Sequence, residues 1–521
     1  MNLDAEVCYK AVLSRDRRFD GRFFTGVKTT GIYCRPICPV HPPKFQNVSF
    51  FACAAAAENA GFRPCRRCHP EVSPGTPAWL GSSAVVSRAL RLISDGALDE
   101  SNVEELALRL GIGSRHLRRL FAEHLGASPA AIARARRVHF AVKLIEETDL
   151  PITEIAFSAG FTSIRQFNHA VRSTFKQSPT ERRQKYGLKK KASMSDNAEN
   201  SSGLAIRLPY RPPFDWATTL RFLQARATPG VEIVEAASYR RTIEIDGQVG
   251  TIELQKDEAE ASLLMIVHLP RYDGLIQVVE RARRIFDLGA DPLPITEHLR
   301  RSPILCRSVE NTPGLRVPGA WDGFELAVRA VLGQQVSVKG ATTLAGRLAQ
   351  RFGRSLQGHE AAGLTHLFPC PETLIEADLS TIGIPVARAK TVRALARHVH
   401  QGEIILDASQ GLPSTISRLC AIPGIGHWTA NYIAMRAFGE TDAFPADDLW
   451  LRRALANGGG LPSTAQMTKE AEAWRPWRSY AAMHLWESFA AIEADTIEGG
   501  KQNAKNYSAG ASRSVSSASW R

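Results

Sequence analysis

Long apolar runs are missing from this chain of 521 residues. No stretch of about eighteen consecutive apolar residues occurs, which excludes a membrane-spanning helix. The N-terminus lacks the basic and apolar regions of a signal peptide, so we expect a cytoplasmic protein without a membrane partner. Acidic residues are outnumbered, with 52 Asp and Glu against 65 Lys and Arg and a net charge of +13. This excess favours a polyanionic partner, most simply nucleic acid, and an anionic membrane surface is the alternative.

Cysteine is also scarce, with nine residues in the whole chain. An odd and mostly scattered set argues against a disulfide framework and agrees with a reducing compartment. Four of the nine form two close pairs, Cys34 with Cys38 and Cys65 with Cys68. Four thiolates in such pairs suit one tetrahedral zinc ion, and four buried free cysteines are the alternative.

Breaks in composition divide the chain into several parts, in line with three or four domains of roughly 150 residues each. We expect a multidomain, mostly α protein with α+β parts. The polar residues between two of the parts are typical of a flexible linker. The predicted units are a small zinc domain (1–78), a helical domain with two helix-turn-helix motifs (83–187), the linker (188–203), a small α+β domain (204–292), an all-α domain (293–495) and a disordered tail (496–521).

The α+β domain contains four stretches with the apolar content of strands. They cover Val231–Ala237, Ser238–Ile245, Val249–Leu254 and Ser262–Leu269. Asp246-Gly247, between the second and the third, favours a tight hairpin turn. Helices are expected on either side of the strands, near Asp215–Ala227 and Gly274–Leu288.

The segments around the cysteine pairs are more specific than their spacing. Thr29-Thr-Gly-Ile-Tyr-Cys-Arg-Pro-Ile-Cys38, Asn47-Val-Ser-Phe-Phe and Ala60-Gly-Phe-Arg-Pro-Cys-Arg-Arg-Cys68 closely resemble the N-terminal domain of the Ada methylation sensors. The resemblance implies one Zn²⁺ on the four cysteines, and it implies that Cys34 accepts a methyl group from a DNA methylphosphotriester. Zinc keeps such a sulfur deprotonated. Methylation would change the net charge of the site from about −2 to about −1 and lower its repulsion from DNA phosphates. A structural zinc site without transfer is the alternative.

Two helix-turn-helix patterns follow, over Val103–Phe121 and Ile152–Arg172. Each combines a short helix, a turn with glycine and a second helix whose polar side chains suit base edges and phosphates. Together with Phe175-Lys-Gln-Ser-Pro-Thr they resemble the DNA-binding domain of the AraC family, which implies reading helices at Ser114–Phe121 and Ser163–Arg172. The candidate DNA contacts are Ser114, Arg115, Arg118, Ser163, Arg165, Gln166 and Asn168. A helical bundle that only joins domains is the alternative.

The last third of the chain contains Pro423-Gly-Ile-Gly before a helical run, and then Asp442-Ala-Phe-Pro-Ala-Asp-Asp-Leu-Trp. A tight turn before a helix exposes N–H groups that can hold a phosphate without reading sequence. This order of motifs, with similar segments at Pro209–Trp216, Val331–Ser337 and Trp474–Tyr480, resembles the helix-hairpin-helix DNA glycosylases, most closely those of the AlkA type. The resemblance implies that the all-α domain (293–495) is a helix-hairpin-helix glycosylase domain.

The same resemblance assigns candidate roles within this domain. Asp448 would stabilise an oxocarbenium-like sugar while water attacks, and whether it also deprotonates that water stays open. Asp447 is expected to be structural, at a helix start. The residues matching an aromatic slot for a flipped, cationic base are Trp428, Tyr432 and Trp486, with ordinary core packing as the alternative for each. The candidate DNA contacts here are Gly424, Gly426, Thr429 and Gln335, and Gln335 takes a place that can hold an apolar wedge.

Three further absences narrow the chemistry. Superfamily members that also cleave the DNA strand resemble Gly-x-Gly-x-Lys-Thr-Ala, whereas Trp428 stands at the lysine position here, so we expect a monofunctional enzyme. No cysteine follows Cys420, so no iron–sulfur cluster is expected. No Pro-Cys-His-Arg motif occurs, so direct reversal of O6-methylguanine is not expected.

These patterns together predict a DNA alkylation repair protein. It would excise alkylated purines such as 3-methyladenine and regulate transcription of the adaptive response through its zinc and helix-turn-helix parts. Its expected partners are damaged and promoter double-stranded DNA, with RNA polymerase as a further candidate. Two alternatives stay open: a regulator whose C-terminal half only binds damaged DNA, and a repair enzyme whose AraC-like part is a nonspecific DNA anchor.

Overall fold

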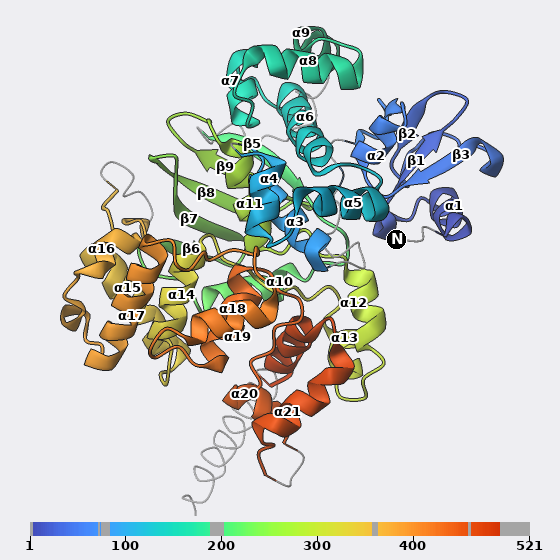
Figure 1. Cartoon of the computed structure of the whole chain (residues 1–521). Coiled ribbons are helices and arrows are strands. Elements are labelled where there is room, and N and C mark those ends of the chain that lie inside the picture. The colour runs from blue at the N-terminus through green and yellow to red at the C-terminus, as the bar shows by residue number, and fades with distance from the viewer. Residues whose placement is uncertain are drawn as a thin grey trace, which may run out of the picture.

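The computed structural model describes residues 4–70, 73, 84–99, 101–187, 203–356, 363–456 and 460–489. The predicted tail and all of the predicted linker except Gly203 lie outside these residues. The predicted fold class is confirmed, because a mostly helical multidomain chain surrounds one larger antiparallel sheet (Figure 1). Within the described residues, no helix combines the length and the apolar character needed to cross a bilayer.

The N-terminal domain is a small sheet with the strand order β3-β1-β2-β4 and one helix at each side. Its elements are α1 (Ala5–Ser14), β1 (Phe24–Val27), β2 (Ile32–Cys34), β3 (Val48–Phe51), α2 (Ala54–Asn59) and β4 (Arg63–Pro64). Cys34 ends β2 and Cys65 follows β4 directly. Because β2 and β4 pair in parallel, they deliver the two cysteine pairs to the same edge of the sheet.

The helical domain contains both predicted helix-turn-helix units. Its helices are α3 (Ala84–Ser94), α4 (Val103–Arg109), α5 (Ser114–Leu125), α6 (Pro129–Glu147), α7 (Ile152–Ser158), α8 (Ile164–Phe175) and α9 (Pro179–Arg182). The predicted reading helices are present as α5 and α8, and both extend beyond the predicted ends. α6 joins the two units, and residues along most of its length are buried.

The α+β domain is a five-stranded antiparallel sheet with the order β5-β9-β8-β7-β6. The strands are β5 (Leu204–Pro209), β6 (Glu232–Val234), β7 (Ser238–Ile245), β8 (Gln248–Lys256) and β9 (Ser262–His268), with helices α10 (Trp216–Gln224) and α11 (Leu275–Ile285). The four predicted strands are confirmed, although β6 is shorter than predicted. The predicted hairpin is confirmed too, because Asp246 and Gly247 both have positive φ, as a type I′ turn requires. Sequence analysis missed the edge strand β5.

The C-terminal domain is all-α among its described residues, apart from one isolated bridge. Its helices are α12 (Pro292–Leu299), α13 (Cys306–Asn311), α14 (Gly323–Leu332), α15 (Val338–Phe352), α16 (Pro371–Ile375), α17 (Val386–His400), α18 (Leu412–Cys420), α19 (His427–Ala437), α20 (Leu449–Ala454) and α21 (Thr464–Ala471), followed by helical residues 478–489. α14 is buried along its whole length and packs against α17 and α19. This packing fixes α19, which carries Trp428 and Tyr432.

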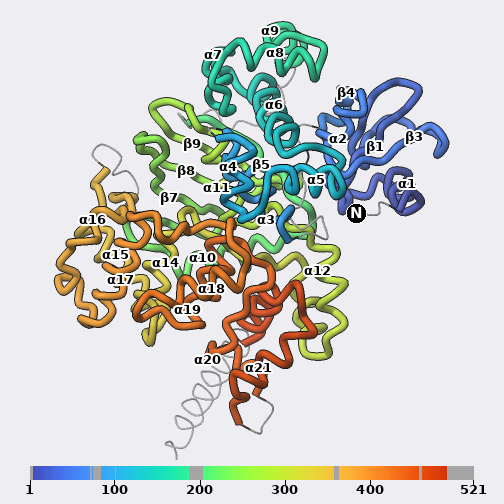
Figure 2. The backbone as a smooth tube through the Cα atoms, in the orientation of Figure 1, coloured from blue at the N-terminus to red at the C-terminus, as the bar shows by residue number. Residues whose placement is uncertain are grey.

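The described residues of the N-terminal half (within 4–187) and of the C-terminal half (within 203–489) pack directly on each other. Figure 2 shows α3 and α11 side by side, although they are far apart in sequence, and Asp95 and Arg284 form an ion pair of 2.8 Å between them. One hydrophobic core runs from α6–α8 into the five-stranded sheet. The two halves therefore form a continuous body in addition to any connection through the linker.

Candidate active site and zinc centre

The side chain of Asp448 caps a helix and accepts four hydrogen bonds. Its Oδ1 accepts from the backbone N–H groups of Trp450 and Leu451 at the start of α20, at 2.9 and 3.0 Å, and from the indole Nε1 of Trp486 at 3.1 Å. Its Oδ2 accepts only from the indole Nε1 of Trp428, at 2.8 Å. An ionised carboxylate oxygen has about two lone pairs, so Oδ2 is the oxygen with capacity left for another group. Asp448 is only 7% exposed, which keeps this carboxylate out of bulk water.

The three predicted slot residues come together beside this carboxylate. The rings of Trp428 and Tyr432, one turn apart on α19, are stacked with centroids 5.3 Å apart and an interplanar angle of 10°. Trp486 meets Tyr432 at 6.3 Å and 62°. All three rings are half-buried, so they combine packing with an accessible face. The two tryptophans also bind the carboxylate, which sequence analysis did not foresee.

Buried guanidinium groups lie behind the aromatic slot. Arg436, one turn beyond Tyr432, donates from Nη1 to the Tyr432 hydroxyl oxygen at 2.8 Å and from Nε to the Pro318 carbonyl at 2.8 Å. Burial alone would raise the pKa of Tyr432, but the nearby positive charges of Arg436 and Arg226 outweigh it and lower the pKa to about 8. The phenol of Tyr432 in the predicted slot therefore ionises at a lower pH than an ordinary tyrosine.

The predicted hairpin lies between α18 and α19. Gly424 has φ +92°, a conformation that favours glycine, and Gly426 is the N-cap residue of α19. Both glycines are exposed, whereas Thr429 is 2% exposed. Gln334, which sequence analysis missed, donates from Nε2 to the Gly424 carbonyl at 2.9 Å and to Thr429 Oγ1 at 3.0 Å. The turn that contains Gln334, between α14 and α15, is thus hydrogen-bonded to the hairpin.

Gln335 lies in the turn where it was expected, whereas Asp447 does not stand at the helix start where it was expected. Gln335 is exposed in the turn between α14 and α15 and has φ +56°, so it projects from a constrained backbone. The prediction that Asp447 stands at a helix start is wrong, because Asp448 is the N-cap residue of α20. Asp447 is exposed, and its Oδ1 accepts a hydrogen bond of 2.6 Å from Thr464. This hydrogen bond connects the loop before α20 to the start of α21.

The four predicted zinc ligands form a single cluster. The sulfurs of Cys34, Cys38, Cys65 and Cys68 all lie within 4.8 Å of one another, and Cys38 Sγ is 4.0 Å from Cys65 Sγ. A tetrahedral zinc site with Zn–S bonds of 2.3 Å needs sulfurs about 3.8 Å apart, so the arrangement fits the metal. The backbone N–H groups of Arg35 and Arg67 point at Cys68 Sγ (3.3 Å) and Cys65 Sγ (3.4 Å), which favours thiolates there.

The predicted DNA-reading side chains lie on the outer faces of α5 and α8. Arg115, Arg118, Arg165 and Gln166 are exposed, while Ser114, Ser163 and Asn168 are half-buried. Arg118 pairs with Glu104 at 2.6 Å, and Ser163 caps α8 by accepting from the Arg165 N–H at 3.2 Å. The faces that carry these residues are available to a groove.

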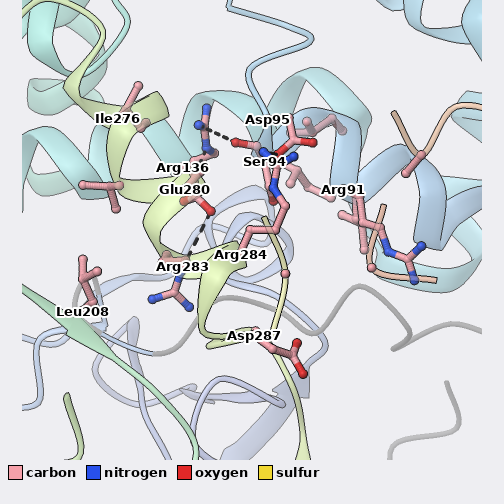
Figure 3. A pocket seen from close by; sticks show the side chains of 18 of the residues that line it. Arg91, Ser94, Asp95, Arg136, Leu208, Ile276, Glu280, Arg283, Arg284 and Asp287 are labelled. Carbon is pink, nitrogen blue, oxygen red and sulfur yellow. Dashed lines mark hydrogen bonds and ion pairs between the residues drawn. The ribbon is translucent and has the colours of Figure 1, made fainter. Parts of the chain in front are cut away.

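A cavity of about 370 Å³ lies where the domains meet. Figure 3 shows Arg136 of α6 with Glu280, Arg283 and Arg284 of α11 around it. None of Asp448, Trp428 and Tyr432 lines this cavity. It belongs to the domain interface and is not the slot for a base.

Family models match four successive segments of the chain. They describe the metal binding domain of Ada (7–71), a helix-turn-helix domain (106–185), the AlkA N-terminal domain (205–322) and the HhH-GPD superfamily of base excision DNA repair proteins (328–479). A probable bifunctional transcriptional activator/DNA repair enzyme AlkA of Mycobacterium tuberculosis is 45% identical over 93% of this chain and 97% of its own length. DNA-3-methyladenine glycosylase 2 of Escherichia coli is 34% identical over 54% of this chain and 95% of its own length. The bifunctional transcriptional activator/DNA repair enzyme Ada of Escherichia coli is 34% identical over 32% of this chain and 47% of its own length.

The fold, the cysteine cluster and the Asp448 site define a multidomain DNA repair protein in which zinc-binding and helix-turn-helix domains precede a base excision domain. The chain belongs to the family of bifunctional AlkA/Ada-type transcriptional activators and DNA repair enzymes. The resemblance drawn from its sequence motifs is thereby confirmed.

Proposed function

We propose that the C-terminal half hydrolyses the N-glycosidic bond of alkylated purines in DNA, 3-methyladenine among them. The observation that carries this proposal is the shielded carboxylate of Asp448, which has one oxygen with spare capacity beside a stack of aromatic rings. An alkylated purine is cationic and already a good leaving group, so little proton donation is needed. The work of the site is to hold the flipped base against the rings and to stabilise the positive charge that develops on the sugar.

DNA would be held by groups around the slot. The exposed turn at Gly424 and Gly426 presents the N–H groups at the start of α19 to one phosphate. The Thr429 side chain is occupied by Gln334, so its contribution to DNA would come from the backbone. Gln335 would enter the duplex beside the flipped base. The reaction is monofunctional in this proposal because an indole, and no amine, stands at position 428.

We expect Asp448→Asn to reduce release of 3-methyladenine from methylated duplex DNA by about 100-fold or more, because the charge that opposes the cationic sugar is lost. Asparagine also caps helices well, so α20 should remain in place. The measurement is chromatography of the freed bases, with circular dichroism and DNA binding as controls. Equal release by the variant, or no release by the wild type, would move the proposal to a C-terminal half that only binds damaged DNA.

The N-terminal half would accept a methyl group at Cys34 and regulate transcription through α5 and α8. The Cys34 sulfur would attack the methyl carbon of a methylphosphotriester, forming a C–S bond and releasing the phosphodiester anion as the C–O bond breaks. Bound Zn²⁺ would hold the four sulfurs as thiolates at neutral pH. Cys34 and Cys38 are half-buried whereas Cys65 and Cys68 are buried, so accessibility favours the first pair as acceptor, and the resemblance to the Ada sensors selects Cys34 within it.

Intact mass spectrometry tests this second part of the proposal. After incubation with DNA that carries methylphosphotriesters, the wild-type chain should gain the mass of one methyl group, and Cys34→Ser should gain none. A methyl group on Cys38, or on neither residue, would reduce the centre to a structural zinc site.

A further inference from the structure

Both predicted reading helices contact the zinc domain. At α5, the Cys53 thiol lies 3.5 Å from the Leu125 carbonyl, and Ala55 and Ala56 of α2 share a hydrophobic core with Phe121 and Leu125. At α8, the helix packs against β4, directly before Cys65. The zinc domain therefore supports both of the helices that would enter DNA.

A first polar chain leads from the Cys34 side of the cluster to the end of α8. The neighbour of Cys34, Tyr33, is fully buried, and its hydroxyl donates to Glu58 Oε1 on α2 at 2.9 Å. The same carboxylate oxygen lies 2.9 Å from Nε2 of His139 on α6. The His139 ring then meets the ring of Phe175, edge to face, with centroids 6.1 Å apart.

A second chain leads from Cys68 to the same ring. His69 follows Cys68 with φ +48°, and its Nδ1 lies 3.4 Å from Glu146 Oε2 on α6. The other oxygen of Glu146 pairs with Arg182 of α9 at 2.6 Å. The Arg182 guanidinium lies over the Phe175 ring, 4.1 Å from its centroid.

Phe175 is the last residue of α8 and is 5% exposed, so its buried ring anchors the C-terminal end of this helix. The two chains start at different cysteine pairs and approach this one ring from separate partners. Glu146 and Arg182 are 8% and 1% exposed, and buried charged groups need well-defined geometry to offset their lost hydration. General adhesion between two domains would not require polar chains that converge in this way.

We infer that Glu58 and Glu146 are positioning residues that transmit the state of the cysteine cluster to reading helix α8 through Phe175. The inference rests on the proposed methyl acceptance at Cys34. When the Cys34 thiolate becomes a thioether, it loses its charge, and the cluster must readjust. Tyr33 is bonded directly to Cys34 in β2, so a shift of Cys34 displaces the Tyr33 hydroxyl and, through Glu58 and His139, the partners of Phe175. The effect adds to the loss of phosphate repulsion, which needs no such chain.

The test compares the wild-type full chain with Glu58→Gln/Glu146→Gln and with a control of equal charge, Glu6→Gln/Glu260→Gln, whose carboxylates are exposed. Each protein is reacted with methylphosphotriester DNA and checked by intact mass. Binding to the duplex upstream of the coding region is measured before and after methylation, and hydrogen exchange is followed in peptides over residues 164–175.

We expect all three proteins to gain one methyl group. Wild type and control should bind more tightly afterwards and change their exchange in α8. The coupling variant, Glu58→Gln/Glu146→Gln, should lose the exchange response. Its gain in affinity on methylation should be at least about fivefold smaller than the gain of the wild type. A coupling variant that keeps both would overturn the inference, since a charge-only effect is then sufficient.

If wild type gains no methyl group, the proposed function of the centre fails and the inference is decided separately. Zinc is then removed with a chelator, and exchange in α8 is compared between wild type and coupling variant. A response in wild type that is weaker in the variant supports the coupling, and equal responses overturn it.

Discussion

At the scale of single residues, the site depends on two indole N–H groups that hold one carboxylate. Trp428 and Trp486 bind opposite oxygens of Asp448, while the Trp450 and Leu451 N–H groups bind one of them from the helix start. Hydrogen bonds to charged groups contribute about 1.5–3 kcal/mol each. The carboxylate is thus held in a fixed orientation before DNA arrives.

Trp486→Phe should therefore lower the rate of base release by about tenfold or more, with a smaller effect on KM. Phenylalanine keeps an aromatic wall but removes the donor to Asp448 Oδ1. The measurement is single-turnover release of 3-methyladenine, with Trp477→Phe as a control, because Trp477 is buried in the core and donates none of the four hydrogen bonds to Asp448. A variant with wild-type kcat and a raised KM would show that Trp486 acts only as a wall of the slot.

A pH dependence follows from Tyr432. Its pKa is lowered to about 8, from an ordinary value near 10, so the ring becomes anionic as pH rises through about 8. An anionic ring attracts a cationic base, so release of 3-methyladenine, which stays cationic in DNA over this range, should increase relative to release of a neutral base without an ionisable N–H, such as 1,N6-ethenoadenine, between about pH 7 and pH 9. Tyr432→Phe should make this ratio independent of pH. A wild-type ratio that is flat over this range would contradict the assignment.

The sequence motifs indicated which residues belong to the candidate site, but they did not indicate which of these residues contact one another. The motif spacing pointed to Asp448, Trp428, Tyr432 and Trp486, and the structure brings these four together. Gln334 was missed because its role depends on a turn meeting a distant hairpin. The helix start was assigned to the wrong aspartate because adjacent residues have equal capping preferences, and only the backbone direction at position 448 separates them.

At the scale of elements, the hairpin before α19 depends on one glycine more than on the other. A Cβ added to Gly424, at φ +92°, would lie 2.0 Å from Thr391 Oγ1, whereas a Cβ added to Gly426 meets nothing within 4 Å. Gly424→Ala should lower the free energy of unfolding by about 2 kcal/mol, through strain and the clash. Gly426→Ala should stay within about 0.5 kcal/mol of wild type. Urea unfolding measures both, and equal losses would show that the turn is not constrained at Gly424.

Element prediction succeeded where local pattern decides structure. The β7–β8 hairpin followed from Asp246-Gly247, and Asp215 and Gly274 mark the starts of α10 and α11. β5 was missed because it pairs only with β9, far along the chain, and ends at Pro209. An edge strand tolerates proline, but proline weakens the strand pattern in the sequence.

At the scale of the whole molecule, α3 and α4 attach the regulatory half to the glycosylase-like half. Arg91 pairs with Glu440 at 2.8 Å, just beyond the end of α19, and Arg109 pairs with Asp407 at 2.7 Å. Composition and motifs do not specify such pairs, because each partner lies in a different domain. The flexible linker predicted from the sequence left open how the two halves are coupled, whereas the described residues show direct packing.

Glu440→Arg should weaken this attachment by about 1–3 kcal/mol, because it places two guanidinium groups together in a half-buried contact. Arg91→Glu/Glu440→Arg should restore most of the loss, since the pair is rebuilt in reverse. Chemical cross-linking between the halves and thermal unfolding measure both variants. Failure of the double variant to recover would mean that the interface does not rely on this pair.

We propose that this one chain contains two independent chemical sites, a base-releasing carboxylate at Asp448 and a methyl-accepting sulfur at Cys34. The most direct test treats alkylated duplex DNA with wild type, Asp448→Asn and Cys34→Ser, and measures freed 3-methyladenine and protein mass in the same samples. We expect Asp448→Asn to gain a methyl group but release little base, and we expect Cys34→Ser to release base but gain no methyl group. Loss of both activities in either correctly folded variant, or base release that survives in Asp448→Asn, would contradict it.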